Sequence, residues 1–139
     1  TFCAGSFSAG EHNDCVAMAK QFADRTHFVH LRSCYIFPNG NFTEASHLGG
    51  RGHLIDLCRI FEKAEQEGKC NSGRRLPMRV DHGMTFTDEP GGVFDESNHG
   101  HNAGYTLLGR MFAMGQIQGV IATVDDELGI EYKQPGFYD

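Results

Sequence analysis

The chain has 139 residues, and its 12 basic and 18 acidic residues give a formal charge of −6. This length suits one ordinary domain, and a composition that is 40% hydrophobic and 22% charged excludes a disordered chain. The negative charge argues against nucleic acid as a partner. The longest apolar run, Gly119 to Val124, is too short to span a membrane. We therefore expect a soluble, cytoplasmic protein.

The cysteines also favour the cytoplasm. Their number is odd, and they lie in segments whose pattern predicts strands and helices rather than loops: Cys3, Cys15, Cys34, Cys58 and Cys70. A disulfide framework is typical of an even number of cysteines in a loop-rich chain. We expect reduced thiols, as in cytosolic proteins.

The apolar pattern predicts strands and helices in alternation. In chain order these are a strand at 1–4, a helix at 13–24, a strand at 26–31, a helix at about 53–67, a strand at 76–81 and a helix from about 104 to 123. Residues 34–44 predict a small β-hairpin that turns at Asn39-Gly40. Three β/α units in tandem imply an α/β fold with parallel strands and outer helices. The predicted inward stripe of the last helix is Leu108, Met111, Phe112, Gly115 and Ile121.

Side chains that bind metals occur where the predicted strands end. Cys3 ends the first strand, His30 lies near the end of the second, and Asp81 closes the third. The carboxyl ends of parallel strands form the ligand site of α/β folds. Thiolate, imidazole and carboxylate together suit Mn, Fe, Co or Zn better than Mg, and three ligands leave positions open for a substrate. Alone, Cys3 and His30 are more typical of core residues, and Asp81 could cap a helix. Their matched positions therefore carry the prediction of a metal site.

Neighbouring residues could supply proton transfer and charge. His82 follows Asp81 directly, and a histidine that titrates near neutral pH is a candidate acid or base. Arg32 shares a strand face with His30, and Arg79 shares one with Asp81, so both arginines are expected at the same mouth. They could bind a substrate carboxylate or form structural ion pairs, and the sequence leaves both open.

Five sequence blocks resemble the C-terminal part of mannonate dehydratase, a sugar-acid lyase. The blocks are Thr1-Phe2-Cys3-Ala4-Gly5-Ser6, Arg25-Thr26-His27-Phe28-Val29-His30-Leu31-Arg32, Phe42-Thr43-Glu44-Ala45-Ser46-His47-Leu48, Met78-Arg79-Val80-Asp81-His82-Gly83 and Ala103-Gly104-Tyr105. They follow in order over nearly the whole chain. The resemblance implies a TIM (β/α)8 barrel of the xylose-isomerase-like type, of which this chain would supply the C-terminal three β/α units.

The resemblance further implies a reaction and roles for residues. The reaction is loss of water from D-mannonate to give 2-dehydro-3-deoxy-D-gluconate in glucuronate catabolism, with Mn²⁺ or Fe²⁺ as cofactor. The expected metal ligands are Cys3, His30 and Asp81, and the expected proton-transfer residues are His82 and Tyr105. Arg32 and His47 fall in blocks expected to line the substrate region, and Arg79 completes the expected substrate-binding set. The alternatives are a sugar isomerase or epimerase of the same barrel type, or an inactive metal-binding fragment.

A complete barrel of this kind needs eight units and roughly 250 residues. We therefore expect residues 1–139 to be a single partial domain that lacks its N-terminal part, where the family carries a further metal-ligating histidine. Unpaired strand edges and an open inner face would need covering. The expected partners are the missing N-terminal part of the same enzyme and a second copy in a homodimer. The acidic, glycine-rich stretch 86–102 is predicted to form a lid.

Overall fold

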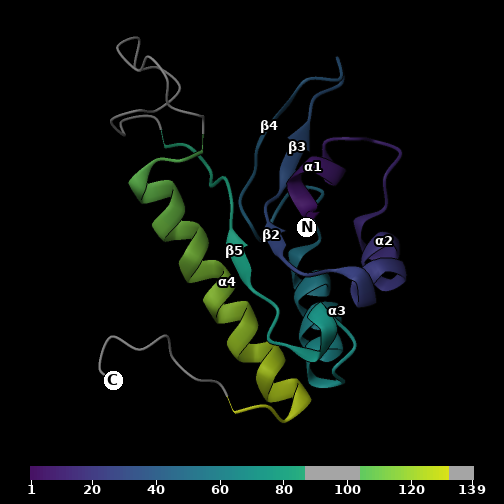
Figure 1. Ribbon diagram of the computed structural model, residues 1–139. Coiled ribbons are helices and arrows are strands. Elements are labelled where there is room, and N and C mark those ends of the chain that lie inside the picture. Colours follow the sequence, from purple (N-terminus) through teal and green to yellow (C-terminus); the bar gives the residue numbers. More distant parts are fainter. Residues whose placement is uncertain (87–103, 132–139) are drawn as a thin grey trace.

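A short parallel sheet lies at the centre of the computed structural model, which describes residues 1–86 and 104–131 (Figure 1). Its strands are β1 (Phe2–Cys3), β2 (Val29–Leu31) and β5 (Met78–Val80), in the order β1-β2-β5. Both pairings are parallel, with Cys3 beside His30 and His30 beside Arg79. The predicted α/β fold with parallel strands is thereby confirmed.

In the described part of the chain, four helices connect and flank these strands. They are α1 (Ala4–Ser8), α2 (Cys15–Phe22), α3 (Leu54–Gln66) and α4 (Leu107–Leu128), with 3₁₀ turns η1 (Ala23–Arg25) and η2 (Asn71–Gly73). Asp14 caps α2, because its side chain accepts a hydrogen bond of 2.9 Å from the backbone of Ala17. The three longer helices agree with the predicted ones. The prediction missed α1, because Gly5-Ser6 is more typical of a turn.

The predicted hairpin is confirmed. Strands β3 (Cys34–Ile36) and β4 (Phe42–Glu44) pair antiparallel, and Gly40 adopts a positive φ of 83° at the turn. Since β3 follows β2 after two residues, the hairpin rises from the end of the sheet at which the candidate site lies (Figure 1). Its base therefore brings Glu44 to that site.

The core lies between the sheet and the helices. Val29, Leu31 and Val80 on the strands are buried, and α3 contributes one apolar face of Leu54, Leu57, Cys58, Phe61 and Ala64. All five cysteines are free thiols. Burial raises the pKa of the Cys58 thiol to about 12, as expected for a cysteine that acts as a small core side chain.

The predicted inward stripe of α4 was wrong for most of its residues: Ile121 packs against the core, but Gly115 is exposed. The buried residues of this helix are Gly109, Ala113, Ile117, Val124 and Asp125, whereas Leu108, Met111 and Phe112 are exposed. Close packing explains the difference. A Cβ on Gly109 would overlap the carbonyl oxygen of Met84, and a Cβ on Gly83 would lie 2.5 Å from the carbonyl oxygen of Gly109. Small residues therefore face the loop after β5, and large apolar residues are left on the outer face.

Helix α4 also bears on the predicted absence of a membrane span. Among the described residues it is the one helix long and apolar enough to cross a membrane by length and composition, although its most apolar window is only 22% buried. The longest uninterrupted apolar run did not indicate this helix, because glycines, glutamines and Arg110 divide its sequence into shorter runs. A core helix passes the same test.

Candidate active site

Three potential metal ligands meet at the carboxyl end of the parallel sheet. Cys3 ends β1 beside His30 in β2, and Asp81 follows β5 directly. Strand alternation directs His30 to the face opposite the buried Val29 and Leu31. The sulfur, a ring nitrogen and a carboxylate oxygen of the three residues all lie within 4.8 Å of one another. The structure thus brings together the three residues predicted as ligands.

These three donors fit a divalent transition metal. A mixed set of sulfur, nitrogen and oxygen ligands suits such ions, which bind each ligand at about 2.0–2.3 Å. His30 Nδ1 and Asp81 Oδ2 face each other at 3.6 Å, beyond hydrogen-bond distance. Ser6 donates a hydrogen bond of 3.1 Å from its hydroxyl to the sulfur of Cys3. Such an outer hydrogen bond orients a ligand and stabilises its charged form.

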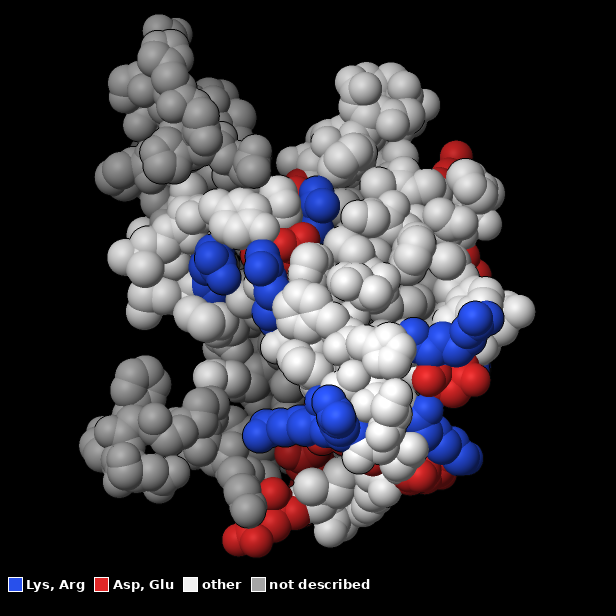
Figure 2. Space-filling view, viewed as in Figure 1, with Lys and Arg blue, Asp and Glu red and all other residues white. Residues whose placement is uncertain are grey.

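Hydrogen-bond donors surround Asp81, which is only 5% exposed. Its Oδ1 accepts two hydrogen bonds, one of 2.6 Å from the hydroxyl of Tyr105 and one of 2.8 Å from the guanidinium of Arg79. Burial alone would raise the pKa of Asp81, but the Tyr105 hydrogen bond and the electrostatic interactions with His82, His30 and Arg79 lower it overall. Figure 2 shows basic and acidic side chains gathered on this face, above β5 and the first turns of α4. The site therefore holds Asp81 as a carboxylate.

Burial has the opposite consequence for His30. It lowers the pKa of the imidazole, with the Asp81 charge opposing this shift and Arg79 adding to it. A lowered pKa keeps the ring neutral at physiological pH. A neutral ring has a lone pair with which to bind a metal.

His82 and Tyr105 lie together beside the ligand cluster. Their rings are 4.5 Å apart between centroids and meet edge to face, and the guanidinium of Arg110 lies 5.2 Å from the Tyr105 ring centroid. The Tyr105 hydroxyl donates a hydrogen bond to Asp81 and accepts one of 2.8 Å from Arg79. Its pKa is raised, first by the hydrogen bond to Asp81 and then by burial. The two predicted proton-transfer residues are therefore neighbours.

Glycine at position 104 permits this approach. Gly104 has a φ of 88°, and a Cβ there would lie 2.7 Å from the Cβ of His82 and 3.2 Å from Cγ of Glu44. Its carbonyl accepts a hydrogen bond of 2.8 Å from the backbone of Gly83. The predicted lid at 86–102 lies outside the described residues except for Phe86.

The three predicted substrate-binding residues have different surroundings. Arg32 is paired with Glu44, Arg79 is 40% exposed in its side chain and bonds to Asp81 and Tyr105, and His47 is 1% exposed. Burial is the main cause that lowers the pKa of His47. Their role toward a substrate stays a prediction, and Arg32 shows the ion pair that the sequence left open.

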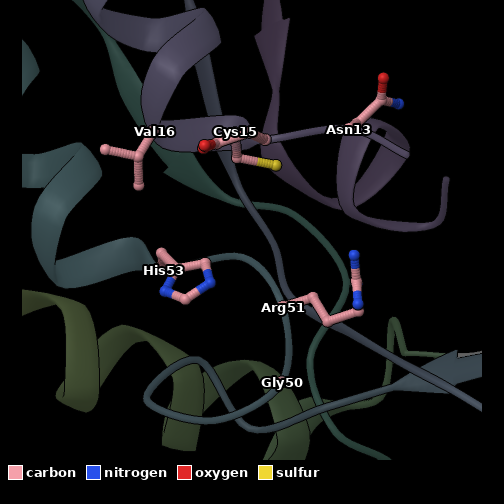
Figure 3. Close-up of a pocket in the computed structure, with 7 residues that line it drawn as sticks. Asn13, Cys15, Val16, Gly50, Arg51 and His53 are labelled. Atoms are coloured by element: carbon pink, nitrogen blue, oxygen red, sulfur yellow. The ribbon is translucent and has the colours of Figure 1, made fainter. Parts of the chain in front are cut away.

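A separate cavity of about 380 Å³ lies between the segments that lead into α2 and α3 (Figure 3). Cys15 lies on one side of it, and Arg51 and His53 lie on the other. Arg51 donates a hydrogen bond of 2.8 Å to the carbonyl of Glu11. None of the predicted site residues lines this cavity, so the ligand cluster at the strand ends is the stronger candidate for a catalytic centre.

Comparison with known proteins identifies the family of the chain. The sequence profile of the D-mannonate dehydratase (UxuA) family matches residues 1–130. The chain belongs to this family. Mannonate dehydratase 2 of Agrobacterium fabrum is 38% identical over 92% of the chain, and mannonate dehydratase of Saccharophagus degradans is 36% identical over 90% of it. The match covers 31% and 30% of these relatives, so the chain spans about a third of their length.

A solved structure supports the fold. The crystal structure of mannonate dehydratase from Streptococcus suis serotype 2 superposes with a TM-score of 0.70 at 19% identity, over all of this chain and 37% of that protein. This family member therefore shares the arrangement of its strands and helices with part of a larger mannonate dehydratase.

Sequence reasoning missed two contributors to the site. Ser6 and Glu44 both lie in the blocks that carry the family resemblance, but their contacts with Cys3 and Arg32 appear only in the folded chain. A usable signal existed for Glu44, because an inward-facing arginine requires an anionic partner. The sequence did not indicate which acidic residue supplies it.

Proposed function

We propose that the enzyme to which this chain contributes removes water from D-mannonate to give 2-dehydro-3-deoxy-D-gluconate, as a carbon–oxygen lyase of glucuronate catabolism. The observation that carries this proposal is the cluster of Cys3, His30 and Asp81 with His82 and Tyr105 beside it. The family match adds the substrate class. A sugar acid also suits a site rimmed by the half-exposed Arg79.

Cys3, His30 and Asp81 are the residues that would hold the cofactor, Mn²⁺ or Fe²⁺. Each offers one donor atom, and the missing part of the protein is proposed to add a histidine. A bound ion of this kind supplies Lewis-acid stabilisation for the negative charge that develops beside a carboxylate when the neighbouring proton leaves.

Two protons must move in the reaction. The proton on the carbon next to the carboxylate is removed, and the departing hydroxyl on the next carbon receives a proton. His82 and Tyr105 are the proposed carriers, because they adjoin each other and Tyr105 touches the ligand Asp81. Arg79 holds the Tyr105 hydroxyl and so orients it toward the same centre.

In the proposed enzyme this chain forms only part of the fold. We propose that its β/α units are the C-terminal three of a TIM (β/α)8 barrel and that residues 1–139 form one partial domain. In this proposal the remaining barrel covers the open sheet, and the complete enzyme is a soluble, cytoplasmic homodimer. The exposed Leu108, Met111 and Phe112 on α4 support the need for such partners.

The decisive experiment measures dehydration of D-mannonate by the complete protein, after chelation and after addition of Mn²⁺ or Fe²⁺. Metal-dependent formation of the 2-dehydro-3-deoxy acid is the expected result. Turnover of neutral sugars without dehydration would instead support the isomerase or epimerase alternative. Metal binding without turnover of any of these substrates would support an inactive metal-binding protein.

A further inference from the structure

Glu44 connects two residues of the candidate site that the sequence treats as independent. Its carboxylate accepts a hydrogen bond of 2.9 Å from Nε of Arg32 and a second from the terminal nitrogen of the same guanidinium. The same Oε1 that accepts this second bond lies 3.3 Å from Nδ1 of His82. The side chains of Arg32, Glu44 and His82 are 13%, 10% and 19% exposed, so the chain of contacts is largely shielded from water.

The paired arginine fixes the carboxylate in place. A bidentate guanidinium–carboxylate pair holds both oxygens in one plane and is stronger than a single hydrogen bond. Arg32 itself lies against α1, where a Cβ on Gly5 would overlap its side chain. Burial of the guanidinium is outweighed by the hydrogen bond and charge of Glu44, so the pKa of Arg32 is raised. Arg32 therefore holds the Glu44 carboxylate in place independently of the contact with His82.

An anchored carboxylate decides which ring nitrogen of His82 carries a proton. A carboxylate can only accept, so its place 3.3 Å from Nδ1 favours a proton on that nitrogen. In the neutral ring this tautomer leaves the lone pair on Nε2. Contact of the ring with Tyr105 and the close approach of Gly104 restrict the ring further.

We propose that Glu44 is the positioning residue of His82: anchored by Arg32, it orients the imidazole and sets its neutral tautomer with the proton on Nδ1. This inference rests on the proposed function, in which His82 transfers a proton. It also changes the expectation for Arg32, whose guanidinium serves the site through Glu44 instead of binding the substrate carboxylate.

A double-mutant cycle tests the proposal in the complete, metal-loaded protein. Glu44→Ala should lower kcat for D-mannonate roughly 10- to 100-fold, with little change in KM or in bound metal. The same substitution in a His82→Ala background should cause no further loss, because Glu44 acts through His82. The Arg32→Ala/Glu44→Ala protein, which carries no unpaired buried guanidinium, should match Glu44→Ala. Thr43→Ser, at the exposed neighbouring position on β4, is the matched control.

A spectroscopic measurement separates this inference from the proposed function. ¹⁵N shifts of labelled imidazoles in the metal-free protein should report the Nδ1-protonated tautomer for His82, and a mixture of tautomers in Glu44→Ala. An equal loss of kcat in the presence and absence of His82, or an unchanged tautomer, would overturn the role of Glu44 while leaving the lyase activity intact. An inactive wild-type protein with the expected shifts would overturn the activity and leave the role of Glu44 standing.

Discussion

Two buried aspartates in this chain have opposite surroundings. Asp81, at the strand ends, is 5% exposed and accepts hydrogen bonds from Tyr105 and Arg79, whereas Asp125, on the buried side of α4, is 6% exposed and its Oδ1 has no hydrogen-bond partner among the described residues. The pKa of Asp81 is lowered overall, and burial raises that of Asp125. Equal burial therefore does not identify a functional carboxylate; the donors aimed at it do.

The second environment extends to α3. Burial is the main cause that raises the pKa of Glu62 to about 7, and the charge of Asp125 adds to it. Both acids lie on the helices that pack beside each other away from the ligand cluster. One end of the molecule thus stabilises negative charge, while the α3–α4 contact resists it.

The largest effect is expected from a substitution that removes the charge of Asp81 and keeps its shape. Asp81→Asn in the complete protein should lose bound metal and reduce turnover of D-mannonate at least about 10³-fold, because a neutral amide replaces the charged ligand. Asp125→Asn is the matched control and should retain both metal and activity. Metal analysis and initial rates check this, and near-normal turnover of Asp81→Asn would contradict the assigned site.

Separating metal binding from proton transfer sharpens the same comparison. His82→Asn should keep its metal and lose roughly 10²- to 10⁴-fold in kcat, since the side chain proposed to move a proton is gone while the three ligands remain. Cys3→Ala should lose metal and activity together. Loss of metal from His82→Asn would show that the histidine does more than transfer a proton.

Packing, and not charge, is expected to dominate stability on the α4 side. Gly109→Ala should lower the free energy of unfolding by roughly 1–3 kcal/mol, because the new Cβ overlaps the Met84 carbonyl. Gly115→Ala on the same helix meets no atom within 4 Å and should be neutral or stabilising by up to about 1 kcal/mol. Denaturant unfolding of both variants measures the contrast, and equal effects would contradict the close packing.

The smallest expected effect is a pH dependence from Glu62. The pKa of its carboxyl is about 7 in the folded chain against an ordinary value of 4.5, so the folded state binds the extra proton and stability falls as pH rises between these values. Glu62→Gln should remove that fall and exceed the wild type by about 1–2 kcal/mol above pH 7, allowing for solvent screening. Unfolding at pH 4 and pH 8, with the exposed Glu131→Gln as control, checks the sign. A larger gain at pH 4 would contradict it.

The sequence predicted much of the site because strand parity and order carry that information. Cys3, His30 and Asp81 end successive parallel strands, so their meeting follows from the β/α pattern. The face of α4 did not follow from the pattern. Its apolar residues lie around the whole helix, and the side that faces the chain is chosen by how closely Gly109 approaches the loop after β5.

Glu44 could not be assigned for a related reason. It lies at the end of a hairpin strand, and its meeting with Arg32 and His82 depends on how that hairpin folds back over the sheet. Local periodicity predicts elements, whereas contacts between an insertion and the sheet depend on the three-dimensional path of the chain. The contact between Glu44 and His82, to which we assign the orientation of the imidazole, is of this kind.

The backbone hydrogen bond from Gly83 to Gly104 fastens both ends of the intervening chain beside the site. His82 and Tyr105 each adjoin one end of this hydrogen bond. The contact between Gly83 and Gly104 therefore holds the two residues near each other. A change that displaces the Gly83–Gly104 contact is therefore expected to misalign His82 and Tyr105 together, although it touches neither side chain.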